Sequence, residues 1–297
     1  MFTLDFVINA ISLGSLYAII ALGLVIVYGI LKLVNYAYGE LIMIAGYMLF
    51  LLGSAGVSPW IILGITAVFT ATLVSYLTEL VAFRPVRTKS MTAILVTSFA
   101  VSTLLQNLVL LIVSPRSRAV PLPDLFAKSV NILGSDVSMR NILTIVISLA
   151  LLGALSLLMK RTILGIALRA AAENFTMTRM LGVPANMVIS VAFILSGFLA
   201  GVVALFWVGR SGSVMPTIGT APLLIAFVAC VIGGMNSLTG AVVGGYIYGI
   251  IFSLLSLFLP QSLLDYRDAF MFAIVILILL FKPEGLVKGG YVPERVG

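Results

Sequence analysis

The feature that most limits what this chain can fold into is the distribution of its charged residues. No charged side chain occurs within residues 6–31, 41–78, 90–115 or 141–159. Only 9% of all residues are charged, 62% are hydrophobic, and the mean hydropathy is +1.24. Soluble domains carry about 25% charged residues. A lipid bilayer is therefore the natural solvent, and we expect residues 1–297 to form a single all-α domain, a polytopic transmembrane helical bundle.

Apolar segments that approach the length of a membrane span recur along the whole chain. A span needs about 20 mostly apolar residues. The expected spans number about eight or nine, some of them broken or re-entrant, at residues 6–31, 35–52, 60–83, 92–113, 142–159, 187–208, 223–232, 241–259 and 269–281. The segment 223–232 is short and ends in Gly233-Gly234, which indicates a break. The first segment has no basic leader and no A-x-A cleavage pattern, so we expect a retained span.

The loops that carry most of the basic residues predict the orientation. Lys and Arg collect in cytoplasmic loops, and here they cluster at 84–89, 160–179 and 282–295. These three clusters can lie inside together if four crossings separate 186 from 282, which places 114–141 outside and the carboxyl terminus in the cytoplasm. The amino terminus lies outside if residues 6–52 cross twice. It lies inside if the chain only breaks at 32–38. The same bias accounts for the net charge of +7 better than nucleic-acid binding does.

Polar residues interrupt the first two apolar segments and form the first candidate site. Asn35, Tyr38, Gly39 and Glu40 follow Lys32 within one short stretch. A charged side chain in hydrocarbon costs several kcal/mol unless it is paired or hydrated. Glycine and asparagine tolerate an unwound turn, and broken helices hold polar solutes in transporters. The stretch is thus either the lining of a substrate path or an ordinary cytoplasmic turn with Lys32 facing water.

Two further polar stretches are candidates. Gly233, Gly234, Asn236 and Ser237 interrupt another apolar run, as a re-entrant tip or a tight cytoplasmic turn, and are included in the predicted path. The basic loop 160–186 contains a helix-forming segment that Gly182 can end. Such a helix, lying on the membrane surface, can dock on another protein. The candidate docking residues are Arg169, Ala171, Glu173, Asn174, Leu181 and Gly182.

Some chemistries are disfavoured by what the sequence contains. There is no histidine and only one cysteine, Cys230, which we expect to be a small core residue. No phosphate-binding loop of the Gly-x-x-x-x-Gly-Lys-Ser/Thr type occurs. We expect no metal, no cofactor and no catalytic activity in the chain itself.

In combination, these segments resemble the branched-chain amino acid (leucine/isoleucine/valine) ABC permease family over nearly the whole chain. The motifs that carry the resemblance are 23–29 with 35–40, 105–109 with 115–118, 169–174 with 181–183, 226–229 with 233–237 and 240–241, and 281–286. Many members have histidine where Tyr38 stands, a departure that bears on the solute.

The resemblance implies a permease subunit of an importer in the inner (plasma) membrane, driven by ATP that partner subunits bind. The implied partners are a second homologous permease, two cytoplasmic ATP-binding subunits docked on a coupling loop at 160–186, an extracytoplasmic substrate-binding protein, and membrane lipid. No nucleic acid is expected. The alternatives are a permease for urea or short amides, and an ion-coupled secondary carrier that uses Glu40 or Glu79, although Glu79 can also be simply interfacial.

Overall fold

The computed structural model describes residues 4–56, 60–87, 89–113, 115–123, 126, 128–132, 135–283 and 285–287, and it is a helical bundle, as the hydropathy predicts. Six helices are long and apolar enough to cross a membrane, and two shorter apolar ones accompany them. The helices are α1 (Leu4–Leu31), α2 (Tyr38–Ser54), α3 (Trp60–Thr78), the π-helical turn η1 (Glu79–Phe83), α4 (Arg84–Val86), α5 (Met91–Ile112), α7 (Met139–Arg161), α8 (Ile163–Glu173), α9 (Phe175–Met180), α10 (Ala185–Ser211), α11 (Thr220–Gly233), α12 (Leu238–Phe258), the 3-10 helix η2 (Gln261–Tyr266) and α13 (Arg267–Phe281).

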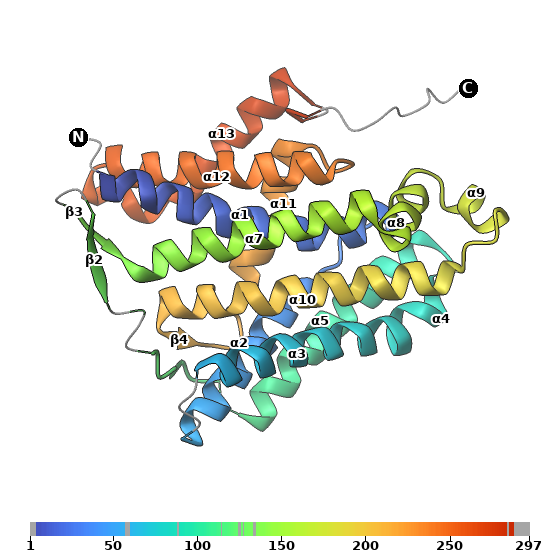
Figure 1. The fold of residues 1–297 in the computed structure, drawn as a ribbon, viewed down its shortest axis with the longest axis horizontal. Coiled ribbons are helices and arrows are strands. Elements are labelled where there is room, and N and C mark those ends of the chain that lie inside the picture. Colours follow the sequence, from blue (N-terminus) through green and yellow to red (C-terminus); the bar gives the residue numbers. More distant parts are fainter. Residues whose placement is uncertain are drawn as a thin grey trace.

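The bundle has two distinct ends (Figure 1). One end, here called the α9 end, carries α4, α8 and α9. The other, the strand end, carries two small antiparallel sheets. In one sheet β1 (Arg118–Ala119) pairs with β4 (Ser213–Val214), and in the other β2 (Ser129–Ile132) pairs with β3 (Ser135–Ser138). These sheets lie in or beside the predicted polar loop 114–141, whose last residues already belong to α7.

The two halves of the chain have the same helix order and matching packing partners. In the first repeat (α1, α2, α3, α5), α2 packs on α3, and α1 packs on α12 and α11. In the second repeat (α10, α11, α12, α13), α11 packs on α12, and α10 packs on α3 and α2. Helix α1 begins at the strand end, whereas α10 ends there, so the repeats run in opposite directions (Figure 1). Inverted repeats of this kind occur in many membrane transporters.

Helices α2 and α11 have 17 and 14 residues and are shorter than any of the six candidate spans. At 1.5 Å per residue they are about 26 and 21 Å long, less than the ~30 Å of a hydrocarbon core. Each follows a largely non-helical segment, 32–37 or 212–219, that leads the chain back into the bundle. The predicted span 35–52 therefore begins with a non-helical turn, and the predicted span 223–232 is the helical part of a longer passage.

The two half-length helices meet at their amino termini through glycine. A methyl group on Gly39 would overlap the carbonyl oxygen of Gly219, and one on Gly219 would overlap that of Gly39. The absence of both side chains lets the two backbones touch, as small residues do between helices in lipid. We call this contact the half-helix junction.

Glycine spacing also explains the tightest full-length packing. Helix α1 is the buried centre of the bundle, and Gly245 and Gly249 of α12 bring that helix within backbone contact of it. Gly197 and Gly201 do the same for α10 on α3. These glycines, spaced four residues apart in each pair, thus act as packing contacts.

The half-helix junction can be tested by adding one methyl group. Gly39→Ala forces the junction apart, and overpacking of this kind costs roughly 1–3 kcal/mol. We expect a lower midpoint of thermal unfolding in detergent, followed by the reaction of a fluorogenic thiol dye with Cys230, which is buried and is the chain's only cysteine.

The matched control is Gly153→Ala. Gly153 is helical and has open space where a methyl group would stand, so its midpoint should stay the same or rise slightly, because alanine favours helix. Equal midpoints for the two variants would show that the junction is not closely packed.

Candidate solute route and coupling region

The segment that enters the bundle before α2 is ordered by hydrogen bonds. The Ala37 amide donates to Asn35 Oδ1 at 3.1 Å, which forms a turn closed by the asparagine side chain. The Tyr36 amide donates to Ser98 Oγ of α5 at 2.6 Å. Lipid could not form hydrogen bonds with these backbone groups, so the protein supplies the partners and thereby stabilises the break in the helix.

Glu40 lies in the first turn of α2, beside the half-helix junction. Its side chain is 4% exposed. Its Oε1 accepts a hydrogen bond from Ser102 Oγ at 3.0 Å, but its buried Oε2 has no hydrogen-bond partner among the described residues. The buried Tyr38 hydroxyl is also without one. Native proteins rarely leave buried polar atoms unsatisfied, so each of these two atoms marks a place where water or a polar solute group can bind.

One face of α5 contacts the non-helical segments of both repeats. Ser98, Ser102 and Gln106 stand four residues apart, which places them on one helix face. They bond to the Tyr36 amide, to Glu40 and, from Gln106 Nε2 at 3.3 Å, to the Pro216 carbonyl of segment 212–219. The sequence prediction did not include these three as site residues. The sequence signal that could have identified them is their four-residue spacing as polar residues within an apolar segment.

The second predicted group of path residues lies elsewhere. Gly233, Gly234, Asn236 and Ser237 form the turn between α11 and α12, in which Ser237 Oγ caps α12 by accepting from the Gly240 amide at 3.0 Å. Asn236 Oδ1 accepts from Lys32 Nζ at 3.3 Å, which joins this turn to the end of α1. The turn therefore lies at the α9 end, and the structure brings together only Asn35, Tyr38, Gly39 and Glu40 at the junction.

The closing segment of the described chain completes that turn. The Leu286 and Val287 amides donate to the carbonyls of Ile232 and Gly233 at 2.8 and 3.1 Å. The last carbonyls of a helix have no partner within the helix. At the end of α11 the Leu286 and Val287 amides supply two such partners. Burial lowers the pKa of the nearby Lys32 ammonium, whose hydrogen-bond partner is a neutral amide.

The predicted coupling loop 160–186 forms helices α8 and α9. Thr162 and Asn174 cap them by accepting from the Gly165 and Met177 amides at 3.1 and 3.0 Å, which gives Asn174 a structural role. Ala171 is buried and holds α8 against the bundle, whereas Arg169 and Glu173 are exposed. Gly182 has a φ of +85°, which favours glycine.

Helix α9 and the residue after it carry exposed apolar side chains. Met177, Met180 and Leu181 are 60%, 77% and 83% exposed. A cavity of about 500 Å³ opens beside α9, between it and the ends of α1 and α5. Contiguous apolar surface rimmed by charge is typical of a protein docking site.

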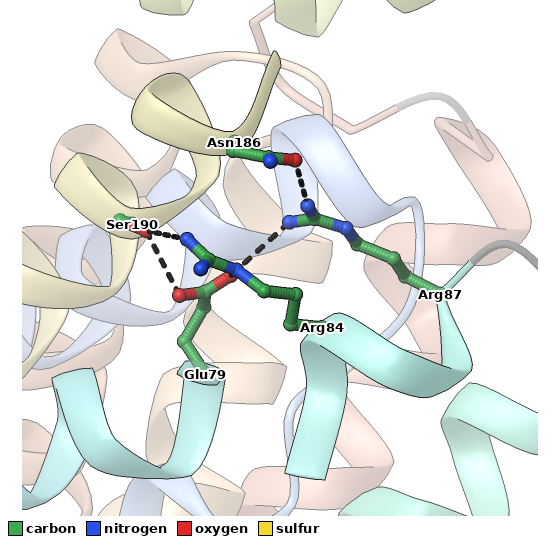
Figure 2. A network of polar contacts seen from close by, with 5 residues as sticks. All are labelled: Glu79, Arg84, Arg87, Asn186 and Ser190. Atoms are coloured by element: carbon green, nitrogen blue, oxygen red, sulfur yellow. Dashed lines mark hydrogen bonds and ion pairs between the residues drawn. The ribbon is translucent and has the colours of Figure 1, made fainter. Parts of the chain in front are cut away.

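A buried ion-pair network ties η1, which follows α3, to the start of α10, the helix that follows α9 (Figure 2). Glu79 is 0% exposed and lies 3.5 Å from Arg84 Nε and 3.1 Å from Arg87 Nη1. Ser190 Oγ donates to its other oxygen at 2.8 Å, and Arg87 also donates to Asn186 Oδ1. Burial lowers the pKa of the Arg87 guanidinium, and Glu79 opposes that shift.

This network changes the interpretation of Glu79. The sequence suggested either an interfacial residue or an ion-coupling acid, but the carboxylate is buried and neutralised by two guanidinium groups. Both carboxylate oxygens are thus engaged by side chains of the protein, which indicates a structural role.

Comparison with known proteins identifies the chain. The family model described as "Branched-chain amino acid transport system / permease component" matches residues 6–279. The chain belongs to this family. It is 35% identical to the high-affinity branched-chain amino acid transport system permease protein LivH of Escherichia coli (strain K12), over 97% of this chain and 96% of that protein.

A further relative and a solved structure are also similar to this chain. The permease protein BraD of Pseudomonas aeruginosa is 35% identical over 94% of both chains. Among solved structures, PsaBC from Streptococcus pneumoniae in complex with Fab has a TM-score of 0.54 and 17% identity, and covers 95% of this chain and 94% of that one. That likeness concerns the fold alone. The family resemblance inferred from the motifs is thus confirmed.

The Glu79 network predicts a measurable contribution to stability. Glu79→Ala leaves two neighbouring guanidinium groups without their shared carboxylate. Breaking a fully buried pair costs roughly 3–5 kcal/mol, and we expect about 2–3 kcal/mol because Arg84 is 36% exposed. The midpoint of Cys230 labelling on heating should fall by several degrees.

Glu173→Ala is the control, because Glu173 is an exposed acid at the same end of the bundle. A surface substitution of this kind changes stability by about 0.5 kcal/mol or less. If both variants unfold at the same temperature, the network is not a structural tie.

Proposed function

We propose that this chain is a membrane-spanning permease subunit of an ATP-driven importer of branched-chain amino acids, and that Glu40 lies on the solute route. The single observation that supports the route most directly is the buried, partly unsatisfied Glu40 carboxylate at the half-helix junction. Family membership supports the solute class, since the matching relatives are named as branched-chain amino acid permeases.

The junction has the polarity that a zwitterionic amino acid requires. The free oxygen of Glu40 can accept hydrogen bonds from an ammonium group, and such charge-assisted bonds are strong. The amino termini of α2 and α11 carry the positive ends of two helix dipoles, which favour a carboxylate. Urea and short amides have neither charge, so this arrangement favours the amino acid over that alternative.

We place the α9 end in the cytoplasm, in the inner (plasma) membrane. The described basic residues of this end are Lys32, Arg84, Arg87, Lys89, Lys160, Arg161, Arg169, Arg179 and Lys282. Positively charged ends remain inside. The carboxyl terminus is then cytoplasmic, because residues 285–287 lie at this end, and the amino terminus is outside.

The exposed surfaces around α9, along α5 and at the strand end each suggest a partner. Two ATP-binding subunits would dock on the exposed apolar side chains around α9 of this chain and of a second homologous permease. That permease would cover α5, a helix of which little is buried within this chain. A substrate-binding protein would deliver the solute at the strand end. The chain itself would catalyse nothing and bind no cofactor, and ATP bound by its partners would shift it between two conformations.

The first functional prediction concerns Glu40. Glu40→Ala should lower uptake of radiolabelled leucine by roughly 10- to 100-fold, because a hydrogen bond to a charged group is worth about 1.5–3 kcal/mol. Uptake is measured in vesicles that contain the complete transporter. Co-purification of the ATP-binding subunits should be normal. Asp268→Asn, an exposed acid at the strand end, should transport normally, and undiminished uptake by Glu40→Ala would remove Glu40 from the route.

The second functional prediction concerns docking. Leu181→Asp places a charge in the proposed interface and should reduce the co-purifying ATP-binding subunits by at least about tenfold, as the loss of a central apolar contact of 1–2 kcal/mol or more does. The protein composition is measured by mass spectrometry after a pull-down in mild detergent.

Leu263→Asp is the matched control, since Leu263 is exposed at the opposite end. Its pull-down should contain the ATP-binding subunits and a second permease in wild-type amounts. Recovery of the wild-type chain alone, under conditions that preserve related complexes, would favour an ion-coupled secondary carrier.

A further inference from the structure

The strand end holds a pair of arginines, Arg140 and Arg210, that form no ion pair with an acid among the described residues. Arg210, in the last turn of α10, donates through Nη2 to Asn141 Oδ1 at 2.9 Å, Ser12 Oγ at 3.2 Å and Asn9 Oδ1 at 3.3 Å. Arg140, in the first turn of α7, donates through Nη1 to the Gly209 carbonyl at 3.2 Å. Each arginine thus reaches the residue beside the other, and all four acceptors are neutral.

Within the part of the chain that the structure describes, no acid pairs with either arginine. The Nε atom of each is also buried without a hydrogen-bond partner among the described residues. The arginines Arg84 and Arg87 at the α9 end, by contrast, share Glu79. Both side chains are partly buried, and holding two such guanidinium groups close together is costly unless an anion joins them.

We propose that Arg140 and Arg210 bind the phosphate of an anionic phospholipid in the leaflet at the strand end. The guanidinium fork matches a phosphate oxygen pair. Both residues stand at the ends of apolar helices, which is the depth of lipid headgroups. The proposal needs only that the chain spans a membrane and is independent of the solute.

Helix α7 provides the surface for the acyl chains. Ile147 lies two turns along α7 from Arg140 on the same face and is 37% exposed, and Val146, Leu149 and Leu157 are 58%, 54% and 63% exposed. A lipid whose phosphate contacts the arginine pair can therefore lay its tails along an apolar helix. An acidic side chain of a docked protein would need no such surface, which favours the lipid.

The proposal is tested by lipid titration of the full chain, purified in mild detergent with the partners it retains, and observed by native mass spectrometry. Each basic residue near a membrane surface contributes about 1 kcal/mol, or roughly fivefold, to the binding of anionic lipid. Arg140→Gln should therefore weaken binding of phosphatidylglycerol about fivefold, and the Arg140→Gln/Arg210→Gln double variant about 25-fold. Phosphatidylcholine should bind more weakly than phosphatidylglycerol to the wild type.

The controls separate this site from general electrostatics and from misfolding. Arg118→Gln removes an exposed charge at the same end and should change binding less than twofold. Arg210→Lys keeps the charge without the fork and should bind with intermediate affinity. Arg140→Gln alone leaves the Arg210 bonds to Asn9, Ser12 and Asn141 intact, so a folded variant is available even if the double variant does not fold.

A second experiment distinguishes a lipid phosphate from free inorganic phosphate as the ligand. Inorganic phosphate at about 10 mM is concentrated enough to occupy a weak anion site with a Kd in the millimolar range. It should neither displace phosphatidylglycerol nor raise the midpoint of Cys230 labelling. If inorganic phosphate does both, the site takes a free anion and the lipid assignment is wrong. Equal phosphatidylglycerol affinity in wild type and Arg140→Gln overturns the proposal, and leaves a neutral structural network or a protein partner's acid as the role of the pair.

Discussion

The half-helix junction is the contact on which the rest of this structure depends. Hydrocarbon offers no hydrogen bonds, so a chain that leaves helical geometry within a membrane has to satisfy its backbone from within the protein. Here two chain segments do so at one place. Asn35 closes the turn before α2, Ser98 and Gln106 of α5 bond to backbone groups of both entering segments, and Gly39 and Gly219 bring the two helix starts into contact. The polar character of the centre follows from that requirement.

Two buried glutamates differ in how fully their carboxylate oxygens are bonded. Glu79 shares its carboxylate between Arg84 and Arg87 and accepts a third bond from Ser190. Glu40 is almost as buried, yet Ser102 is its one hydrogen-bond partner among the described residues. The first arrangement leaves no capacity for a further ligand. The second leaves an acceptor free next to two helix amino termini, where a polar solute gains most.

Much of the architecture could be predicted because apolar length alone determines helices in lipid. The uncharged runs gave the long helices, and the polar stretch around Glu40 marked the break after α1. The non-helical segment before α11 was harder to predict. Residues 212–219 contain no charge, and the main signals of a break there are Gly212, Pro216 and Gly219. The Glu79 network could not be foreseen, since Ser190 and Asn186 come from a distant helix. Arg87 also reaches Glu79 across the π-helical turn η1 (Glu79–Phe83), whose wider spacing alters the register of an ordinary helix.

The packing pattern also indicates which parts of the molecule can move together. The closest full-length contacts join a helix of one repeat to a helix of the other, α1 with α12 through Gly245 and Gly249, and α3 with α10 through Gly197 and Gly201. The Glu79 network adds a second tie to the α3–α10 pair, next to the coupling region. Close-packed pairs resist internal deformation and move as rigid bodies. The half-length helices meet at their starts across two glycines, without interlocking side chains at those positions. A displacement that begins at α9 would therefore pass through the rigid α3–α10 pair and be taken up at the junction, beside Glu40.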